Sequence, residues 1–194
     1  QEENSELKKQ VEQLLKDTYI SNSKKWRVAN LRYFNPIGAH SSGLIGESPL
    51  GVPDNVFPYL TQVAAGNLEK LFIFGNDWST TDGTGVRDYI HVMDLAEGHI
   101  STLEYLMNSN PQIINLNLGT QIRTSVLDLI DVFERVNKIK IPYEFKKRRP
   151  GDCSSVIANI SLAKSIINWT PKRDIESMCI DGWKWQSANP LGYK

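Results

Sequence analysis

The chain opens with an apolar stripe at helical spacing. Most of the polar positions of this segment are Glu, Lys or Gln. The apolar residues between them recur at helical spacing, and they are Leu7, Val11, Leu14 and Leu15. This period predicts an amphipathic helix over residues 1–20. No strand and no glycine-rich turn precedes this helix, so we expect the chain to begin in the middle of a larger fold.

The apolar run from Val28 to Phe34 predicts a buried strand. Pro36 ends this strand, because proline has no N–H to donate to a sheet and restricts the residue before it. Asn35 therefore lies at the carboxyl end of a strand. In open α/β sheets, ligands bind in the crevice beyond these ends.

Strand-like and helix-like patterns alternate along the rest of the chain. The predicted strands cover residues 71–74, 86–92, 113–118, 143–147 and 155–158, and the predicted helices cover residues 55–65, 95–108, 125–136 and 161–167, with a last helix from 174. The expected helix caps are Asp94, Ser161, Asp174 and a capping box formed by Ser125 and Asp128. In helix 95–108 we expect one apolar side made of Leu95, Ile100, Leu103 and Leu106. This alternation predicts an α/β fold.

Composition narrows the class of protein. The chain has 194 residues, 40% hydrophobic, with 22 basic and 22 acidic side chains, as expected of a globular protein with one sizeable core. The balanced charge argues against a nucleic-acid partner, and no apolar run approaches the roughly 20 residues of a membrane span. Cys153 and Cys179 form no disulfide framework or zinc pattern, which favours a cytoplasmic protein with free thiols. The three histidines lack metal spacing, so we predict no metal.

Two turns carry arginines that could bind an anion. Arg87 lies within residues 85–89, and Arg149 lies within residues 148–152, which end at Asp152. A guanidinium matches phosphate oxygens with two parallel hydrogen bonds, and a nearby carboxylate could accept bonds from ribose hydroxyls. The alternative is that both turns are ordinary solvated loops.

Phe72 and Phe74 stand two places apart in the predicted strand 71–74. We expect them to project to opposite faces, so that one meets a flat base while the other fills the core. The alternative is that both belong to the core.

Several segments resemble the UDP-glucose 4-epimerase family of extended short-chain dehydrogenases. The most specific is Asp-Gly-Thr-Gly-Val-Arg-Asp-Tyr-Ile-His-Val at 82–92, and the others are residues 31–40, 74–77, 148–152, 183–186 and 189–193. The resemblance covers nearly the whole chain after residue 10. It implies the carboxyl-terminal part of such an enzyme: residues 1–35 as the end of a Rossmann sheet and residues 36–194 as a smaller α/β UDP-sugar-binding part, with 86–118 packing back on the Rossmann part.

The resemblance also implies a chemistry and a set of roles. The family interconverts UDP-glucose and UDP-galactose, with a tyrosine taking the 4-hydroxyl proton and bound NAD taking the C4 hydride. The implied roles are Tyr33 and Phe34 on the cofactor side, Asn35 at the diphosphate, Asn55 and Val56 on the UDP, Phe72 and Phe74 beside the uracil, Arg87 and Arg149 on the diphosphate, Asp152 on the ribose, and Tyr89 as support for the pocket.

The chain departs from the family at the catalytic centre. The glycine-rich unit that holds NAD is missing, so the chain lacks most of the cofactor site. In the expected Tyr-x-x-x-Lys motif, Lys8 matches the lysine, but Asn4 falls on the tyrosine, and a carboxamide is no general base at neutral pH. Val156 stands where a tyrosine can line the sugar pocket, which suggests a roomier pocket.

These departures leave more than one function open. The first hypothesis is the substrate-binding portion of the epimerase, an isomerase fragment that is inactive alone. The alternative is a non-catalytic UDP-sugar-binding or interaction module, and a nucleotide-sugar dehydratase is a weaker third choice. In each case we expect a UDP-sugar partner. The bare apolar stripe of the first helix also predicts a homodimer or higher oligomer.

Overall fold

The computed structural model describes the backbone of residues 2–193 and the side chains of residues 6–193. The helices are α1 (Glu2–Ser21), α2 (Val56–Ala64), α3 (Val92–Asn108), α4 (Val126–Asn137), α5 (Ser161–Ile167) and α6 (Ile175–Ala188). The strands are β1 (Arg27–Tyr33), β2 (Asn35–Ile37), β3 (Leu71–Phe74), β4 (Val86–Arg87), β5 (Tyr89–His91), β6 (Gln112–Leu118), β7 (Thr124–Ser125), β8 (Tyr143–Lys146) and β9 (Ser155–Val156). The α/β fold expected from the sequence is confirmed.

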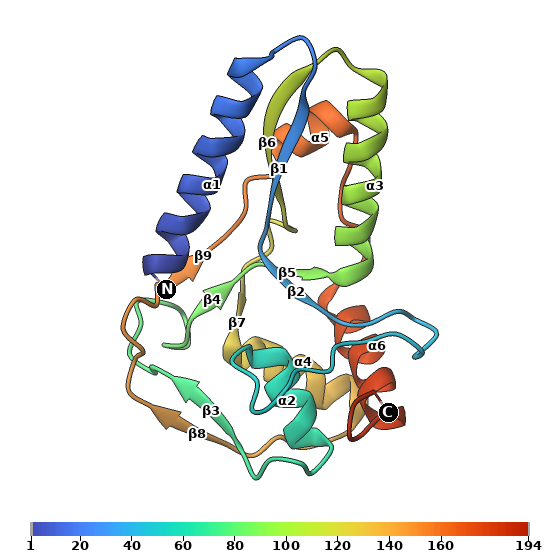
Figure 1. Cartoon of the computed structure of the whole chain (residues 1–194). Coiled ribbons are helices and arrows are strands. Elements are labelled where there is room, and N and C mark those ends of the chain that lie inside the picture. Colours follow the sequence, from blue (N-terminus) through green and yellow to red (C-terminus); the bar gives the residue numbers. More distant parts are fainter. Residues whose placement is uncertain (1, 194) are drawn as a thin grey trace.

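The upper half of the molecule in Figure 1 is built on the parallel pair β1 and β6. The two strands run in register from Arg27 opposite Gln112 to Tyr33 opposite Leu118. Helix α1 covers one face of this pair, and α3 and α5 lie on the other side. The strand alternation explains this division, since neighbouring residues point to opposite faces: Arg32 pairs with Glu12 of α1, whereas the next residue, Tyr33, faces α3.

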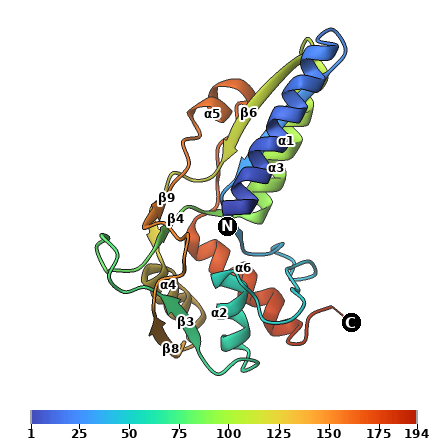
Figure 2. The same ribbon diagram turned by 60° about the vertical axis from the view of Figure 1, so that its left-hand side comes forward.

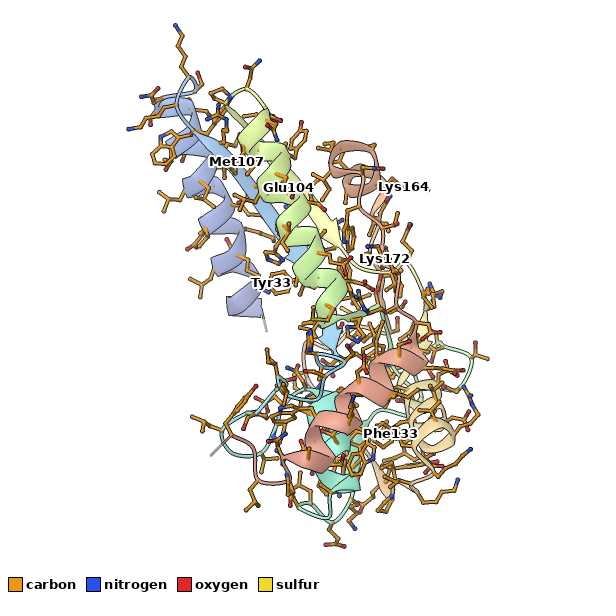
Figure 3. The ribbon with its side chains drawn as sticks, turned by 90° about the vertical axis from the view of Figure 1, so that its right-hand side faces the viewer. Tyr33, Glu104, Met107, Phe133, Lys164 and Lys172 are labelled. Carbon is orange, nitrogen blue, oxygen red and sulfur yellow. The ribbon has the colours of Figure 1, made fainter. Side chains whose placement is uncertain are left out.

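The lower half in Figure 1 has its own hydrophobic core between α2, α4 and α6. Phe133 of α4, labelled in Figure 3, lies at its centre, with edge-to-face contacts to Phe57 of α2 and Trp183 of α6. The parallel pair β3 and β8 flanks this core on one side. Figure 2 shows that the two halves form separate layers joined near β4 and β9.

Asp88 joins the segments at the junction between the halves. Its fully buried carboxylate accepts hydrogen bonds from the Thr120 N–H and hydroxyl, both 2.7 Å, from the Gln121 N–H at 2.9 Å, and from the Ala158 N–H at 3.1 Å. The prediction of one strand over 86–92 was wrong for this reason. The chain breaks at Asp88 into β4, which pairs with β7 and β9, and β5, which pairs with β2.

The capping predictions had mixed outcomes. The capping box of Ser125 and Asp128 and the N-cap of Asp174 are confirmed. The other two caps were wrong: α3 is capped by His91, whose Nδ1 accepts the Met93 N–H at 3.0 Å, and α5 is capped by Ile160 with no side-chain bond. Asp94 lies inside α3, fully buried, and accepts the backbone N–H groups of Lys172 and Arg173 instead.

The prediction for the apolar side of the third helix was only partly right. Leu95 is buried as expected, but Ile100 and Leu103 are exposed, and α3 buries Gly98 and Thr102 in their place. A Cβ at Gly98 would come within 3.1 Å of Leu118 and 3.2 Å of Trp169. The small residues allow α3 to pack closely on the core around β6, and this close contact decides which side of the helix is buried.

Candidate functional site

A cavity with a volume of about 570 Å³ lies between the arginine-bearing turns. It is bounded by β3, by the start of α2, by the β2 and β4 ends, and by the turn after β8. The residues that the sequence proposed as substrate-binding and that line it are Asn35, Asn55, Val56, Phe72, Phe74, Arg87, Tyr89, Arg149 and Asp152. Their functional roles remain predictions, but the fold brings them to one place.

The aromatic wall of this cavity is formed by β3. Phe72 and Phe74 are half-buried, whereas Leu71 and Ile73 are fully buried in the core. The expectation that the two phenylalanines point to opposite faces was wrong, because residues two apart in a strand share a face. Both rings therefore line the cavity, and Phe72 also makes an edge-to-face contact with Tyr59.

One edge of β3 is left open beside the cavity. The N–H groups of Leu71 and Gly75 donate to β8 and its flank, to Pro142 and Lys146, at 2.8 Å each. In a parallel pair, alternate residues direct their backbone groups to opposite edges. The N–H and C=O groups of Phe72 and Phe74 therefore point away from β8. The Phe74 carbonyl accepts a hydrogen bond from the Trp78 indole Nε1 at 3.3 Å, and a ligand can bond to the other groups of this edge.

The two arginines are held by neighbouring groups. The Arg149 Nε donates to Asp152 at 3.0 Å, and its guanidinium lies over the Phe74 ring, 4.7 Å from the centroid. The Arg87 Nη1 donates to the carbonyl oxygens of Val86 and Cys153, both at 2.9 Å. Within the described part of the chain, the Nη groups of Arg149 have no acceptor, so they remain available to an anion.

Two further walls of the cavity come from helix and strand ends. Asn55 is the N-cap of α2 and makes no side-chain capping bond, and both Asn55 and Val56 line the cavity, so the start of this helix lies at the cavity wall. Such helix starts favour negative charge. Tyr89 is almost completely buried, and burial raises the pKa of its phenol far above its usual value, so it stays protonated.

The remaining candidates lie outside this cavity. Val156 is 40% exposed and pairs with Arg87 in the β4–β9 ladder, and it does not line the cavity. Tyr33 is 55% exposed between α1 and α3, as Figure 3 shows, and Phe34 packs partly against the upper core. Lys8 is an exposed residue of α1. Asn4 belongs to α1, but its side chain lies outside the described ones.

The proposed cofactor-side residues lie apart from this cavity, since neither Tyr33 nor Phe34 lines it. Among the described residues, no cluster of three His, Cys, Asp or Glu side chains is placed to hold a metal ion. No helix within residues 2–193 combines the length and apolar character needed to cross a membrane.

Several lining residues were missed by the sequence analysis. They are Val52, Pro53, Asp54, Tyr59, Leu71, Ile73, Trp78, Gly85 and Val126. Trp78 carried a signal that could have been used, because a tryptophan in a polar loop between two proposed binding segments is unusual on a purely solvated surface. Leu71, Tyr59 and Val126 resemble ordinary core positions, and only the fold shows that they reach the cavity.

A parallel strand pair covered by helices on both sides, joined to a second half with an arginine-lined cavity, is the arrangement of the carboxyl-terminal part of an extended short-chain dehydrogenase. A family model described as GDP-mannose 4,6 dehydratase matches residues 8–181. The chain belongs to this family of NAD-dependent epimerases and dehydratases.

Within the family, the chain is similar to UDP-glucose 4-epimerases. It is 51% identical to the UDP-glucose 4-epimerase of Bacillus subtilis, and the match covers 97% of this chain and 55% of the relative. It is 50% identical to UDP-glucose 4-epimerase 2 of Arabidopsis thaliana, with 94% of this chain and 52% of the relative covered. The chain spans about half the length of these relatives.

Solved structures agree with this similarity. The Stenotrophomonas maltophila UDP-glucose 4-epimerase, with bound NAD and formylated UDP-arabinopyranose, superposes with a TM-score of 0.90 and 47% identity, over 93% of this chain and 53% of that one. The Bifidobacterium longum UDP-glucose 4-epimerase, in complex with NAD+ and UDP, superposes with a TM-score of 0.89 and 42% sequence identity. The match covers 94% of this chain and 53% of that one.

Proposed function

We propose that this chain is the UDP-sugar-binding portion of a UDP-glucose 4-epimerase, an NAD-dependent isomerase that inverts C4 of UDP-sugars. The observation that carries the proposal is the shared cavity of Asn35, Arg87, Arg149 and Asp152 beside the aromatic wall of β3. The similarity to epimerases over nearly the whole chain supports it. The presence of free thiols, Cys153 exposed and Cys179 buried, is consistent with a cytoplasmic location.

The base end of the proposed site is the open edge of β3. Uracil offers an N3–H donor beside the O4 acceptor. The Phe72 carbonyl and the Phe74 N–H are neighbouring groups on this edge and present the complementary acceptor and donor. The Phe72 and Phe74 rings flank the same space and supply apolar contact to a flat base.

The diphosphate end combines two cations with a helix start. The Nε of Arg149 is oriented by Asp152, and its Nη groups remain available to the diphosphate. The second cation, Arg87, lies on β4. The first N–H groups of α2 add a favourable electrostatic field for an anion. The Asp152 carboxylate retains acceptor capacity for ribose hydroxyls, and Asn35 offers an amide at the start of β2.

We further propose that this chain alone does not catalyse the reaction. The chemistry that NAD supplies in this family is transfer of the C4 hydride, and the residues present hold no complete site for it. Asn4 stands in place of the tyrosine that would take the 4-hydroxyl proton. Incubation of the pure chain with NAD and UDP-galactose should yield no UDP-glucose, and measurable turnover would refute this part of the proposal.

Binding tests the central claim separately from turnover. Titration calorimetry with UDP-glucose and UDP should give micromolar dissociation constants, while uridine, which lacks the diphosphate, should bind much more weakly. Absence of any binding up to millimolar UDP would show that this cavity is no UDP site, and the proposed function would fail.

The alternative function, a non-catalytic UDP-sugar-binding or interaction module, is favoured by one observation, the amide of Asn4. Two hybrid proteins distinguish these functions. In both, the amino-terminal half of the Bacillus subtilis epimerase is fused to this chain; one hybrid keeps Asn4 and the other carries Asn4→Tyr. Epimerase activity that appears only with Asn4→Tyr supports the substrate-binding portion of an epimerase. Tight UDP-sugar binding without activity in either hybrid supports the module.

A further inference from the structure

Three cations at or just after the end of β8 lie over aromatic rings of β3 and of the loop that follows it. With distances to the ring centroid, the pairs are Lys146 over Phe72 at 4.7 Å, Arg148 over Trp78 at 4.0 Å and Arg149 over Phe74 at 4.7 Å. Such contacts are attractive, because the face of an aromatic ring is negative. Of the three pairs, Arg149 and Phe74 are the one in which both residues line the cavity.

Asp152 holds the Arg149 guanidinium at a single point. The bond from Nε to the carboxylate is 3.0 Å long, and 42% of the Arg149 side chain is exposed to solvent. One hydrogen bond leaves the rest of the guanidinium free to swing about it. Bidentate binding of a phosphate, however, requires two N–H groups of the planar fork to face the oxygens at once. The bond to Asp152 therefore does not by itself present the Nη groups to an anion.

The ring of Phe74 supplies a second contact from a fixed position. Phe74 is the last residue of β3, a strand whose alternate side chains are buried in the core. Its carbonyl oxygen accepts a hydrogen bond from the Trp78 indole at 3.3 Å, and the next N–H, that of Gly75, donates to β8 at 2.8 Å. The backbone that carries the ring is thus held on both sides, and the ring limits how far the Arg149 guanidinium can swing.

A fixed contact of this kind matters most for a long, flexible side chain. An arginine that is ordered only when its ligand arrives gives up rotamer freedom at that moment, and this cost weakens binding. Because Asp152 and Phe74 both contact the guanidinium, part of the ordering has already taken place in the free protein. An anion at the Nη groups of Arg149 should bind more tightly as a result.

We propose that Phe74 is a positioning residue that presents the Arg149 guanidinium to the diphosphate of a UDP-sugar. The inference rests on the proposed function, because it takes the anion at Arg149 to be that diphosphate. It gives Phe74 a role at the diphosphate end, in addition to the base contact expected from the sequence. Phe72 provides the contrast, since its cation, Lys146, is paired with Glu144 and lies outside the set of residues that line the cavity.

A double-mutant cycle with UDP tests this link between the two residues. Titration calorimetry gives the loss of UDP affinity on Phe74→Leu, first in the unaltered chain and then in the Arg149→Gln variant. Contacts of the ring with the base, or with the rest of the fold, are lost equally in both backgrounds and cancel. We expect the loss to be about two- to fivefold larger when Arg149 is present, the usual value of a partly exposed cation–π contact.

Phe72→Leu and Phe145→Leu are the matched controls, because they make the same substitution on the paired strands β3 and β8. Phe72→Leu should cost the same UDP affinity in both backgrounds. Phe145→Leu, at an exposed position outside the cavity, should leave UDP affinity unchanged in both. If Phe72→Leu couples to Arg149 as strongly as Phe74→Leu does, the specific role of Phe74 is overturned.

The outcomes separate this inference from the proposed function. If the unaltered chain binds no UDP, the proposed function fails, and the inference fails with it. If UDP binds and Phe74→Leu weakens it by the same factor with and without Arg149, the positioning role is overturned while the UDP site stands. Should circular dichroism show that Phe74→Leu loses its fold, Phe74→Met replaces it, because methionine also lacks the ring, and the same criterion applies.

Discussion

The guanidinium of Arg87 donates a hydrogen bond to the carbonyl oxygen of Cys153, 2.9 Å away. Cys153 directly follows Asp152, so this bond ties β4 to the turn that carries Arg149 and Asp152. Two cationic side chains from distant parts of the sequence are thereby held at one cavity before any ligand arrives. Such preorganisation lowers the entropic cost of binding an anion.

Replacement of Arg149 by glutamine should weaken UDP binding selectively. The change removes a charged donor pair from the diphosphate end, and charge-assisted bonds of this kind typically contribute about 10–100-fold in affinity. Calorimetry should show this loss for UDP, while the weak binding of uridine stays unchanged. Arg135→Gln, an exposed arginine of α4, is the control and should leave both ligands unaffected. An equal loss for uridine would contradict a phosphate role for Arg149.

Replacement of Asp88 by asparagine should destabilise the whole fold. The carboxylate accepts bonds from Thr120, Gln121 and Ala158, and an amide would turn an N–H donor towards at least one of these donors. We expect the free energy of unfolding to fall by about 2–3 kcal/mol, the cost of leaving buried donors unsatisfied. Urea denaturation measures this loss. The control Asp131→Asn, at an exposed site of α4, should change stability by less than about 0.5 kcal/mol.

His91 should make the stability depend on pH. Burial, opposed in part by the hydrogen bond to Asp181, holds the pKa of His91 below its usual value. The unfolded chain therefore binds the proton more readily than the folded one, so stability is greatest above the unfolded pKa of about 6.5 and falls as the pH drops below it.

The variant His91→Asn tests this pH dependence. Asparagine can still cap α3 through its side-chain oxygen, but it does not titrate. Urea midpoints measured between pH 5 and pH 8 should fall on acidification less steeply for His91→Asn than for the unaltered chain. His40→Asn, which replaces a histidine bonded to Ser42, is the control. Identical slopes for His91→Asn and the unaltered chain would exclude His91 as the source.

The exposed stripe of α1 should cause self-association. Leu7, Val11 and Leu14 are all more than half exposed on one side of the helix, although they are apolar. Burial of these side chains against a second copy removes apolar area from water. We expect sedimentation velocity to show a dimer or larger species at micromolar concentrations. Leu14→Lys should weaken association at least tenfold, whereas Leu44→Lys, an exposed apolar loop residue elsewhere, should not. A monomer at every concentration would contradict this prediction.

Local patterns predicted most of the elements correctly. The strands 71–74 and 113–118 and the helix after the Ser125–Asp128 capping box were predicted within a few residues. These features depend on contacts within about four residues, which the sequence displays directly. The break at Asp88 could not be predicted in this way, because its bonding partners lie on the loops after β6 and β9.

By itself, the sequence determined the α/β class and the residue types available for binding. The arginine turns, the paired phenylalanines and the family motifs are all local features, and each was visible without coordinates. Only the tertiary structure decided how these features combine. It buried Gly98 and Thr102 in place of Ile100 and Leu103, set Trp78 against the Phe74 carbonyl, and left Val156 outside the cavity. The physical reason is that close packing and hydrogen bonding between distant segments follow from the path of the whole chain, which no short window of sequence contains.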